Sequence, residues 1–194
     1  METFKAIRYS RFANSEYNCR MILKPQDIVV ALKLCSTGRM GRPSFAQIAA
    51  ELKMSASEVH AAVQRCQTAH LLSPPELGNR PNIPALREFL IHGVKYAFPA
   101  ERGEPTRGML TGYAARPLDK LIAPGDDLPP VWPDPEGPSK GASFEPLYKT
   151  APFAARQDPF LYECLALVDA LRDGRVREKK IAENELTMRL RQSG

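Results

Sequence analysis

The eighteen prolines of this 194-residue chain are concentrated in one stretch, because nine of them fall between residues 117 and 152. Proline lacks a backbone N–H and has a fixed φ, so this density excludes a regular helix or a central strand. We therefore predict that residues 117–157 form an extended, proline-rich arm. Four large side chains are available to dock that arm: Trp132, Phe144, Leu147 and Tyr148.

Before the arm, residues 25–72 carry three helical patterns. Apolar residues at helical spacing predict a first helix from Pro25 to about Ser36. Capping-box spacings, in which a serine precedes Gln or Glu by three residues, mark the starts of the next two helices: Ser44 with Gln47, and Ser55 with Glu58. The second and third helices are thus separated by a short turn of three or four residues.

The segment SFAQIAAELKMSASEVHAAVQRC has the features of a helix-turn-helix unit. Ala49 is the small residue where the second helix meets the third, and Val59 is the apolar residue that attaches the third helix to the core. In these residues, and in the Ala69-His-Leu-Leu that follows, the chain resembles the winged helix-turn-helix regulators of bacteria, MarR-like in the broad sense. The resemblance covers about residues 25–72. Lys53 stands where that family commonly has a glycine.

The resemblance implies that residues 55–67 form a recognition helix that lies in the major groove of DNA. The apolar stripe of this helix faces the core, which leaves four polar residues as candidates for base readout: Ser55, Ser57, His60 and Gln64. Five cations around the helix are candidates for phosphate contacts: Arg39, Arg42, Lys53, Arg65 and Arg80. Lys33 is a further candidate. The alternative for the whole unit is a three-helix bundle that does not bind DNA, and the alternative for each of these residues is an ordinary solvated surface.

The wing of such a domain has two candidate positions. One is the loop Gly78-Asn-Arg-Pro, whose Arg80 would contact the DNA backbone; we prefer this one because it follows the recognition helix closely. The other is a β-hairpin formed by the β-favouring runs Val94–Phe98 and Met109–Ala114, after a helix at Pro84–His92.

Two helical patterns follow the arm, at Pro159–Leu171 and Val176–Leu190. We predict that they form a dimerisation or partner-binding element, with these leucines and valine at the seam: Leu161, Leu165, Val168, Leu186 and Leu190. The expected fold is mainly α with a small β-hairpin. Its parts are an N-terminal arm (1–20), a winged helix-turn-helix domain (21–116), the proline-rich arm (117–157) and the C-terminal helices (158–194).

Charge and motif content narrow the function. The net charge is +5, and residues 1–99 hold 13 Lys and Arg against 7 Asp and Glu, which favours an anionic partner, although a mild positive bias alone is also compatible with these numbers. The four cysteines have no zinc-ligand spacing, and we expect no metal and no cofactor. The known catalytic motifs are absent, so we expect no enzyme. Without a signal sequence or membrane span, a cytoplasmic location is expected.

The sequence therefore predicts a sequence-specific DNA-binding transcriptional regulator, a dimeric repressor that binds double-stranded DNA. Two alternatives stay open. One is an antitoxin-like module that clamps a protein partner with its proline-rich arm and represses its own operon. The other is a winged helix that acts on RNA or in replication.

Overall fold

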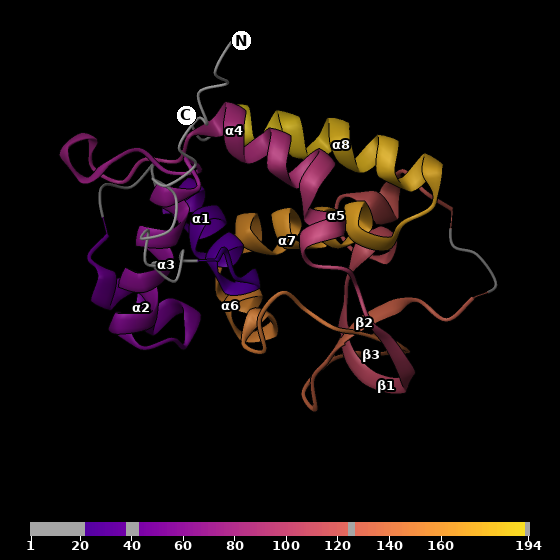
Figure 1. Cartoon of the computed structure of the whole chain (residues 1–194). Coiled ribbons are helices and arrows are strands. Elements are labelled where there is room, and N and C mark those ends of the chain that lie inside the picture. The colour runs from indigo at the N-terminus through magenta and orange to yellow at the C-terminus, as the bar shows by residue number, and fades with distance from the viewer. Residues whose placement is uncertain (1–21, 38–42, 124–126, 193–194) are drawn as a thin grey trace, which may run out of the picture.

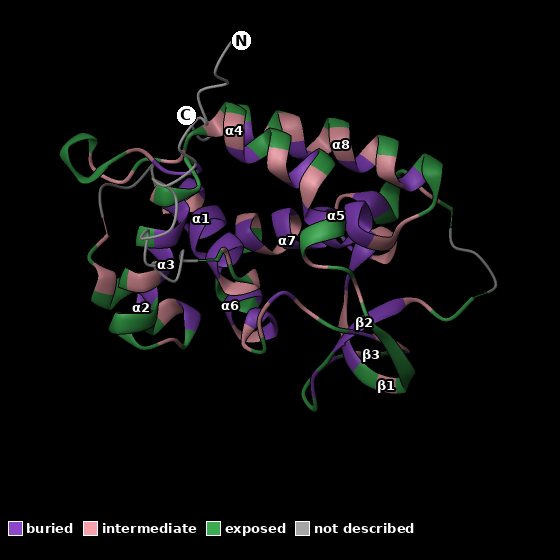
Figure 2. Ribbon diagram, viewed as in Figure 1, coloured by how far each residue is buried: buried purple, intermediate pink, exposed green. Residues whose placement is uncertain are grey.

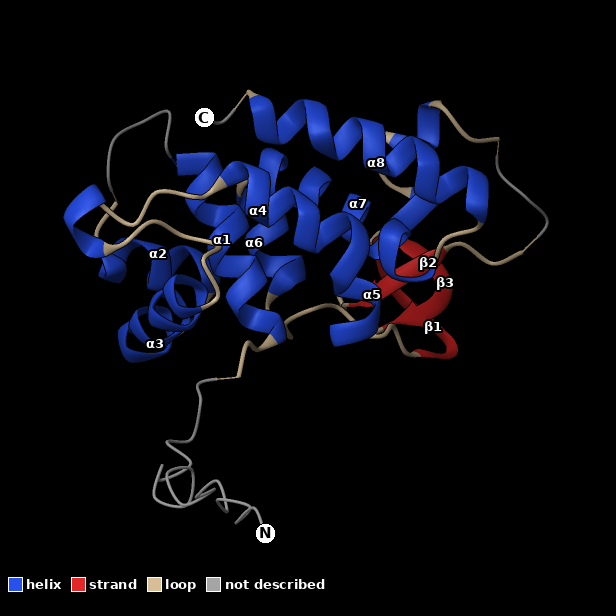
Figure 3. Cartoon of the chain, turned by 45° about the horizontal axis from the view of Figure 1, so that its top comes forward, coloured by secondary structure: helices blue, strands red, loops and turns tan. Residues whose placement is uncertain are grey.

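The computed structural model of the protein describes residues 22–37, 43–123 and 127–192. Helices make up most of it, and three strands form one small sheet at the end opposite α2 and α3 (Figures 1 and 3). The expectation of a mainly α fold with a small β region is confirmed. The helices are α1 (Pro25–Thr37), α2 (Phe45–Leu52), α3 (Ala56–Thr68), α4 (Ile83–Glu88), α5 (Val94–Ala97), α6 (Ala151–Gln157), α7 (Pro159–Asp173) and α8 (Val176–Arg191). The strands are β1 (Arg102–Leu110), β2 (Pro130–Pro133) and β3 (Ser139–Phe144).

Helix α7 is the centre of the core. It packs against α1, α5, α6 and α8, and Figure 2 shows it buried along most of its length. Its apolar residues face all directions, as in Leu161-Tyr-Glu-Cys-Leu-Ala-Leu-Val, and a helix that is apolar on every side is buried on every side. The helices before and after the sheet are thus held together by one element near the C-terminus.

This packing corrects the prediction of a dimer seam in the C-terminal helices. The five seam residues are each at most 1% exposed within the single chain: Leu161, Leu165, Val168, Leu186 and Leu190. Their stripes face α7, α8 and the rest of the core. The apolar periodicity marks a surface that packs within the same chain and not the predicted seam between two chains.

The three strands form a sheet that closes on itself. Strand β1 pairs antiparallel with both β2 and β3, while β2 and β3 pair parallel with each other. Two glycines permit this close approach, because a Cβ at Gly108 would lie 2.0 Å from the carbonyl oxygen of Trp132, and one at Gly141 would lie 2.0 Å from that of Pro129. Strands β2 and β3 and helix α6 all belong to residues 117–157, so the prediction of an extended arm was wrong for these three elements.

The proline-rich stretch is anchored in the core rather than extended away from it. Trp132 is 1% exposed, and its Nε1 donates a hydrogen bond of 2.6 Å to Asp169 Oδ2 in α7. The same carboxylate accepts a bond of 2.7 Å from the Thr111 hydroxyl and pairs with Arg172 at 2.8 Å. Trp132, Phe144 and Leu147 are buried, as predicted for docking residues, and Tyr148 is half-buried.

The predicted hairpin between Val94–Phe98 and Met109–Ala114 is also corrected. Val94–Ala97 is helix α5, which continues α4 through a π-helical turn at Phe89–Gly93. Val94 is fully buried, and packing of this helix against α7 outweighs the local preference of its residues for strand. Strand β1 instead occupies Arg102–Leu110, most of which was predicted to be the hairpin loop.

Candidate functional site

Helices α2 and α3 both begin with the predicted capping boxes. The Ser44 hydroxyl accepts a hydrogen bond from the Gln47 N–H at 3.2 Å, and the Gln47 side chain accepts one from the Ser44 N–H at 2.8 Å. Ser55 and Glu58 repeat this reciprocal pair at 3.2 and 2.9 Å. Each box satisfies two backbone donors that a helix start leaves free, so both helices have defined first residues.

The turn between α2 and α3 is tight and left-handed. Lys53 has φ 50° and ψ 45°, and the N–H of Met54 donates to the Ala49 carbonyl at 2.9 Å. This conformation is the one that glycine adopts most readily at the end of a helix. Lys53 therefore has the backbone conformation that a glycine would readily adopt at this position.

Helix α3 has one buried face and one exposed face. Val59, Ala62, Val63 and Cys66 are at most 2% exposed and form the predicted core stripe. On the other side Ser55, Ser57, His60 and Gln64 are all exposed. The Ser55 hydroxyl is engaged in the cap, whereas the His60 ring lies edge-on to Phe45, with ring centroids 5.6 Å apart. The face thus offers an imidazole, an amide and a hydroxyl to a partner.

Two of the cations predicted to contact phosphate are held inside the fold. Arg65 is 9% exposed, and its Nε and Nη2 donate bonds of 2.7 and 2.6 Å to the buried carboxylate of Asp27 in α1. Lys33 is 5% exposed and pairs at 2.6 Å with both Asp158 and Glu51. Both side chains join α1 to other helices, so the structure corrects their assignment as phosphate contacts.

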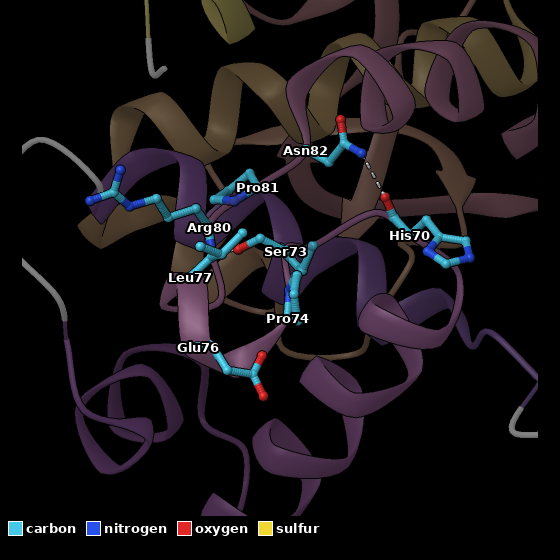
Figure 4. Close-up of a pocket in the computed structure, with 9 residues that line it drawn as sticks. His70, Ser73, Pro74, Glu76, Leu77, Arg80, Pro81 and Asn82 are labelled. Atoms are coloured by element: carbon cyan, nitrogen blue, oxygen red, sulfur yellow. Dashed lines mark hydrogen bonds between the residues drawn. The ribbon is translucent and has the colours of Figure 1, made fainter.

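A short bridged loop follows α3 directly; we use this name for Leu71–Asn82. Leu72 and Pro81 form an isolated antiparallel bridge, and the Ser73 N–H donates to the Arg80 carbonyl at 2.7 Å. Asn82 donates to the His70 carbonyl at 3.0 Å, which fixes the base of the loop to the end of α3 (Figure 4). Gln67 also bonds from α3 to Asn79 at 2.6 Å.

Arg80 lies on this bridged loop and is exposed, with its guanidinium extending away from the pocket that the loop encloses (Figure 4). Lys53 is exposed as well, and its Nζ lies 4.1 Å from the centre of the Phe153 ring. These two predicted cations flank α3, one beyond each end. Arg39 and Arg42 lie outside the described residues.

The sequence interpretation missed a contact between α3 and the segment that precedes α6. The Tyr148 hydroxyl donates to Glu58 Oε1 at 3.3 Å, and the Thr150 hydroxyl donates to the Leu52 carbonyl at 2.6 Å. Hydrogen bonds from the Ser55 backbone and hydroxyl, aided by Tyr148 and the nearby Lys149 charge, lower the pKa of Glu58. About ninety residues separate the partners along the chain, so no local pattern signals the contact.

Other kinds of site are not indicated by the described residues. In residues 22–37, 43–123 and 127–192, no three His, Cys, Asp or Glu side chains gather as a metal site requires. The helices among them lack the length and apolar character needed to cross a membrane. Comparison with protein-family models, with curated proteins and with solved structures found no match.

Proposed function

We propose that this protein binds double-stranded DNA through the exposed face of α3 and acts as a sequence-specific transcriptional regulator. The single observation that carries the proposal is the α2–turn–α3 unit, in which a left-handed turn and two capping boxes present a helix face whose polar side chains are exposed. A helix inserted into the major groove reads bases with side chains of this kind.

The bridged loop supports the same proposal. The loop follows α3 directly along the chain, its two sides are joined by an antiparallel bridge, and it carries the exposed Arg80. A winged helix places a short antiparallel hairpin at this point, beside the recognition helix. We therefore interpret the bridged loop as a reduced wing, with Arg80 as a phosphate contact.

The test is a gel-shift titration of the full chain on the DNA upstream of its own gene and on a scrambled fragment, at two salt concentrations. We expect selective, salt-sensitive binding. Replacing His60 with Ala lowers the preference for the upstream fragment, whereas Arg80→Ala weakens binding to both fragments about equally. Asn184→Ala, an exposed change on α8, is the matched control and leaves both affinities unchanged.

Each alternative predicts a different result. Double-stranded RNA that competes as well as DNA would favour an RNA-binding winged helix over a DNA regulator. A protein-clamping function for the proline-rich stretch has less support, because Trp132 is buried in the chain's own core and the Tyr148 hydroxyl donates to Glu58. The absence of selective binding at either salt concentration would contradict the proposal.

A further inference from the structure

We propose that Lys149, together with Lys53, forms a second phosphate-binding flank of the DNA surface, at the opposite end of α3 from Arg80. This inference rests on the proposed function and adds a residue from a distant part of the chain. It divides the phosphate contacts between two segments that bracket the recognition helix.

The fold places Lys149 beside the helix-turn-helix turn. Its two neighbours in sequence are both attached there, Tyr148 to Glu58 in the first turn of α3 and Thr150 to Leu52 at the last residue of α2. A residue between two such anchors has little freedom to move away. Lys149 itself is exposed, and so is Lys53 in the turn.

Phe153 holds the second lysine on the same side. The Lys53 Nζ stacks over the Phe153 ring at 4.1 Å, so the cation in the turn rests on the first residues of α6. Helices α2 and α6 are in contact, and Figure 1 shows α6 on the side of α2 and α3 that faces the middle of the molecule. Lys53 and Lys149 are therefore both positioned by the segment from Tyr148 to Phe153, although 96 positions separate the two lysines in the sequence.

The length of α3 explains why cations at both ends are useful. Its 13 residues span about 20 Å, whereas the major groove of B-DNA is about 12 Å wide. A helix that lies in the groove with an inclination across it brings its two ends close to the phosphate strands that border the groove. Arg80 lies beyond the C-terminal end, and Lys53 and Lys149 lie at the N-terminal end.

The acidic groups near this flank are already engaged. Glu58, the only acid in the α3 sequence, bonds to Ser55 and Tyr148, and Glu51 pairs with Lys33. These bonds do not remove their charge, but they hold both carboxylates in place beside cations or donors. The Lys149 ammonium offsets the Glu58 charge that DNA would otherwise meet at the start of α3.

The experiment compares Lys149→Ala with Lys140→Ala by gel shift of the full chain on the upstream fragment at several salt concentrations. Lys140 is an exposed lysine on β3, at the end of the molecule opposite α3 (Figure 3), and serves as the matched control. We expect Lys149→Ala to weaken binding about 3- to 10-fold and to reduce the salt slope by about one, with Lys140→Ala unchanged. Lys149→Arg keeps the cation and retains the wild-type affinity.

The outcomes separate this inference from the proposed function. Equal affinities of Lys149→Ala, Lys140→Ala and wild type, while Arg80→Ala binds more weakly, would overturn the second flank and leave DNA binding intact. A wild-type protein that binds no DNA would overturn both. Equal thermal midpoints of the Lys149 and Lys140 variants exclude unfolding as the cause of any loss.

Discussion

Helices α3 and α7 each begin with a side chain that accepts a hydrogen bond from the third residue of the helix, and they have 13 and 15 residues, but their surroundings differ. Helix α7 is enclosed by α1, α5, α6 and α8, whereas α3 packs on α1 and α2 and leaves its other side in solvent (Figure 2). The difference indicates which residues the fold needs. Stability depends on every face of α7, while the outward face of α3 is exposed, as the proposed DNA binding requires.

The largest effect is expected from a cavity in α7. Leu165 is 1% exposed, and Leu165→Ala removes buried methyl groups from the middle of the core. We expect a loss of about 2–5 kcal/mol of unfolding free energy. Denaturant unfolding measures it, with Met188→Ala on α8 as the control, because Met188 is 48% exposed. Similar losses for the two variants would mean that α7 is not the core helix.

The next effect concerns the ion pair beneath α3. Asp27→Ala leaves the buried Arg65 guanidinium without its carboxylate, and we expect a loss of about 3 kcal/mol. Asp127→Ala breaks a pair with Arg175 of similar length, 2.7 Å, in which both side chains are exposed, so the loss there should be small. Equal thermal midpoints for the two variants would show that Arg65 does not depend on Asp27.

A further effect depends on pH. Burial raises the pKa of Asp158, but hydrogen bonds from Lys33, Ser36 and the Leu161 N–H outweigh burial and hold it below its ordinary value of 3.8. A lowered pKa in the folded state adds stability above the unfolded value, and this stability is lost as the pH falls through the folded value.

The free energy of unfolding of wild type should therefore exceed that of Asp158→Asn near neutral pH, and the difference should disappear as the pH is lowered through and below about 4. Protonation of Asp158 at low pH removes the charge that the variant lacks at every pH. Denaturant midpoints of both proteins measured between pH 3 and 7 provide the check. An advantage of wild type that stayed constant over this range would rule out the ionised Asp158 as its source.

The smallest effect on stability is expected on the outward face of α3. A double variant with His60→Ala and Gln64→Ala should unfold within about 0.5 kcal/mol of wild type, because neither side chain is buried. Its preference for the upstream DNA fragment should nevertheless be lost. A large loss of stability in this variant would show that the outward face of α3 contributes to the stability of the fold, as the faces of α7 do.

What could be predicted from the sequence was local. The capping boxes at Ser44 and Ser55 involve residues three positions apart, so their spacing predicts the helix starts, and both are present in the structure. The outward position of His60 and Gln64 follows from helical periodicity in the same way, and both are exposed.

What could not be predicted depends on distant partners. Arg65 resembles a free surface cation until Asp27, 38 positions earlier, is found beside it, and Lys33 has its partner Asp158 125 positions away. Strand β2 could not be predicted for a similar reason. It begins at Pro130 and ends at Pro133, and prolines disfavour a strand when only the local sequence is considered. No pattern in the sequence indicated a role for Lys149, since its position depends on the hydrogen bonds of its neighbours Tyr148 and Thr150.

The left-handed turn at Lys53 sets two properties against each other at one position. A residue with a Cβ is disfavoured in this conformation by roughly 1–2 kcal/mol, whereas glycine adopts it freely. A glycine there would favour the folded state and remove a cation from the surface that we propose to face DNA. If the proposed DNA binding holds, the turn is a compromise between stability and affinity, because a less favourable backbone conformation keeps a positive charge at this position.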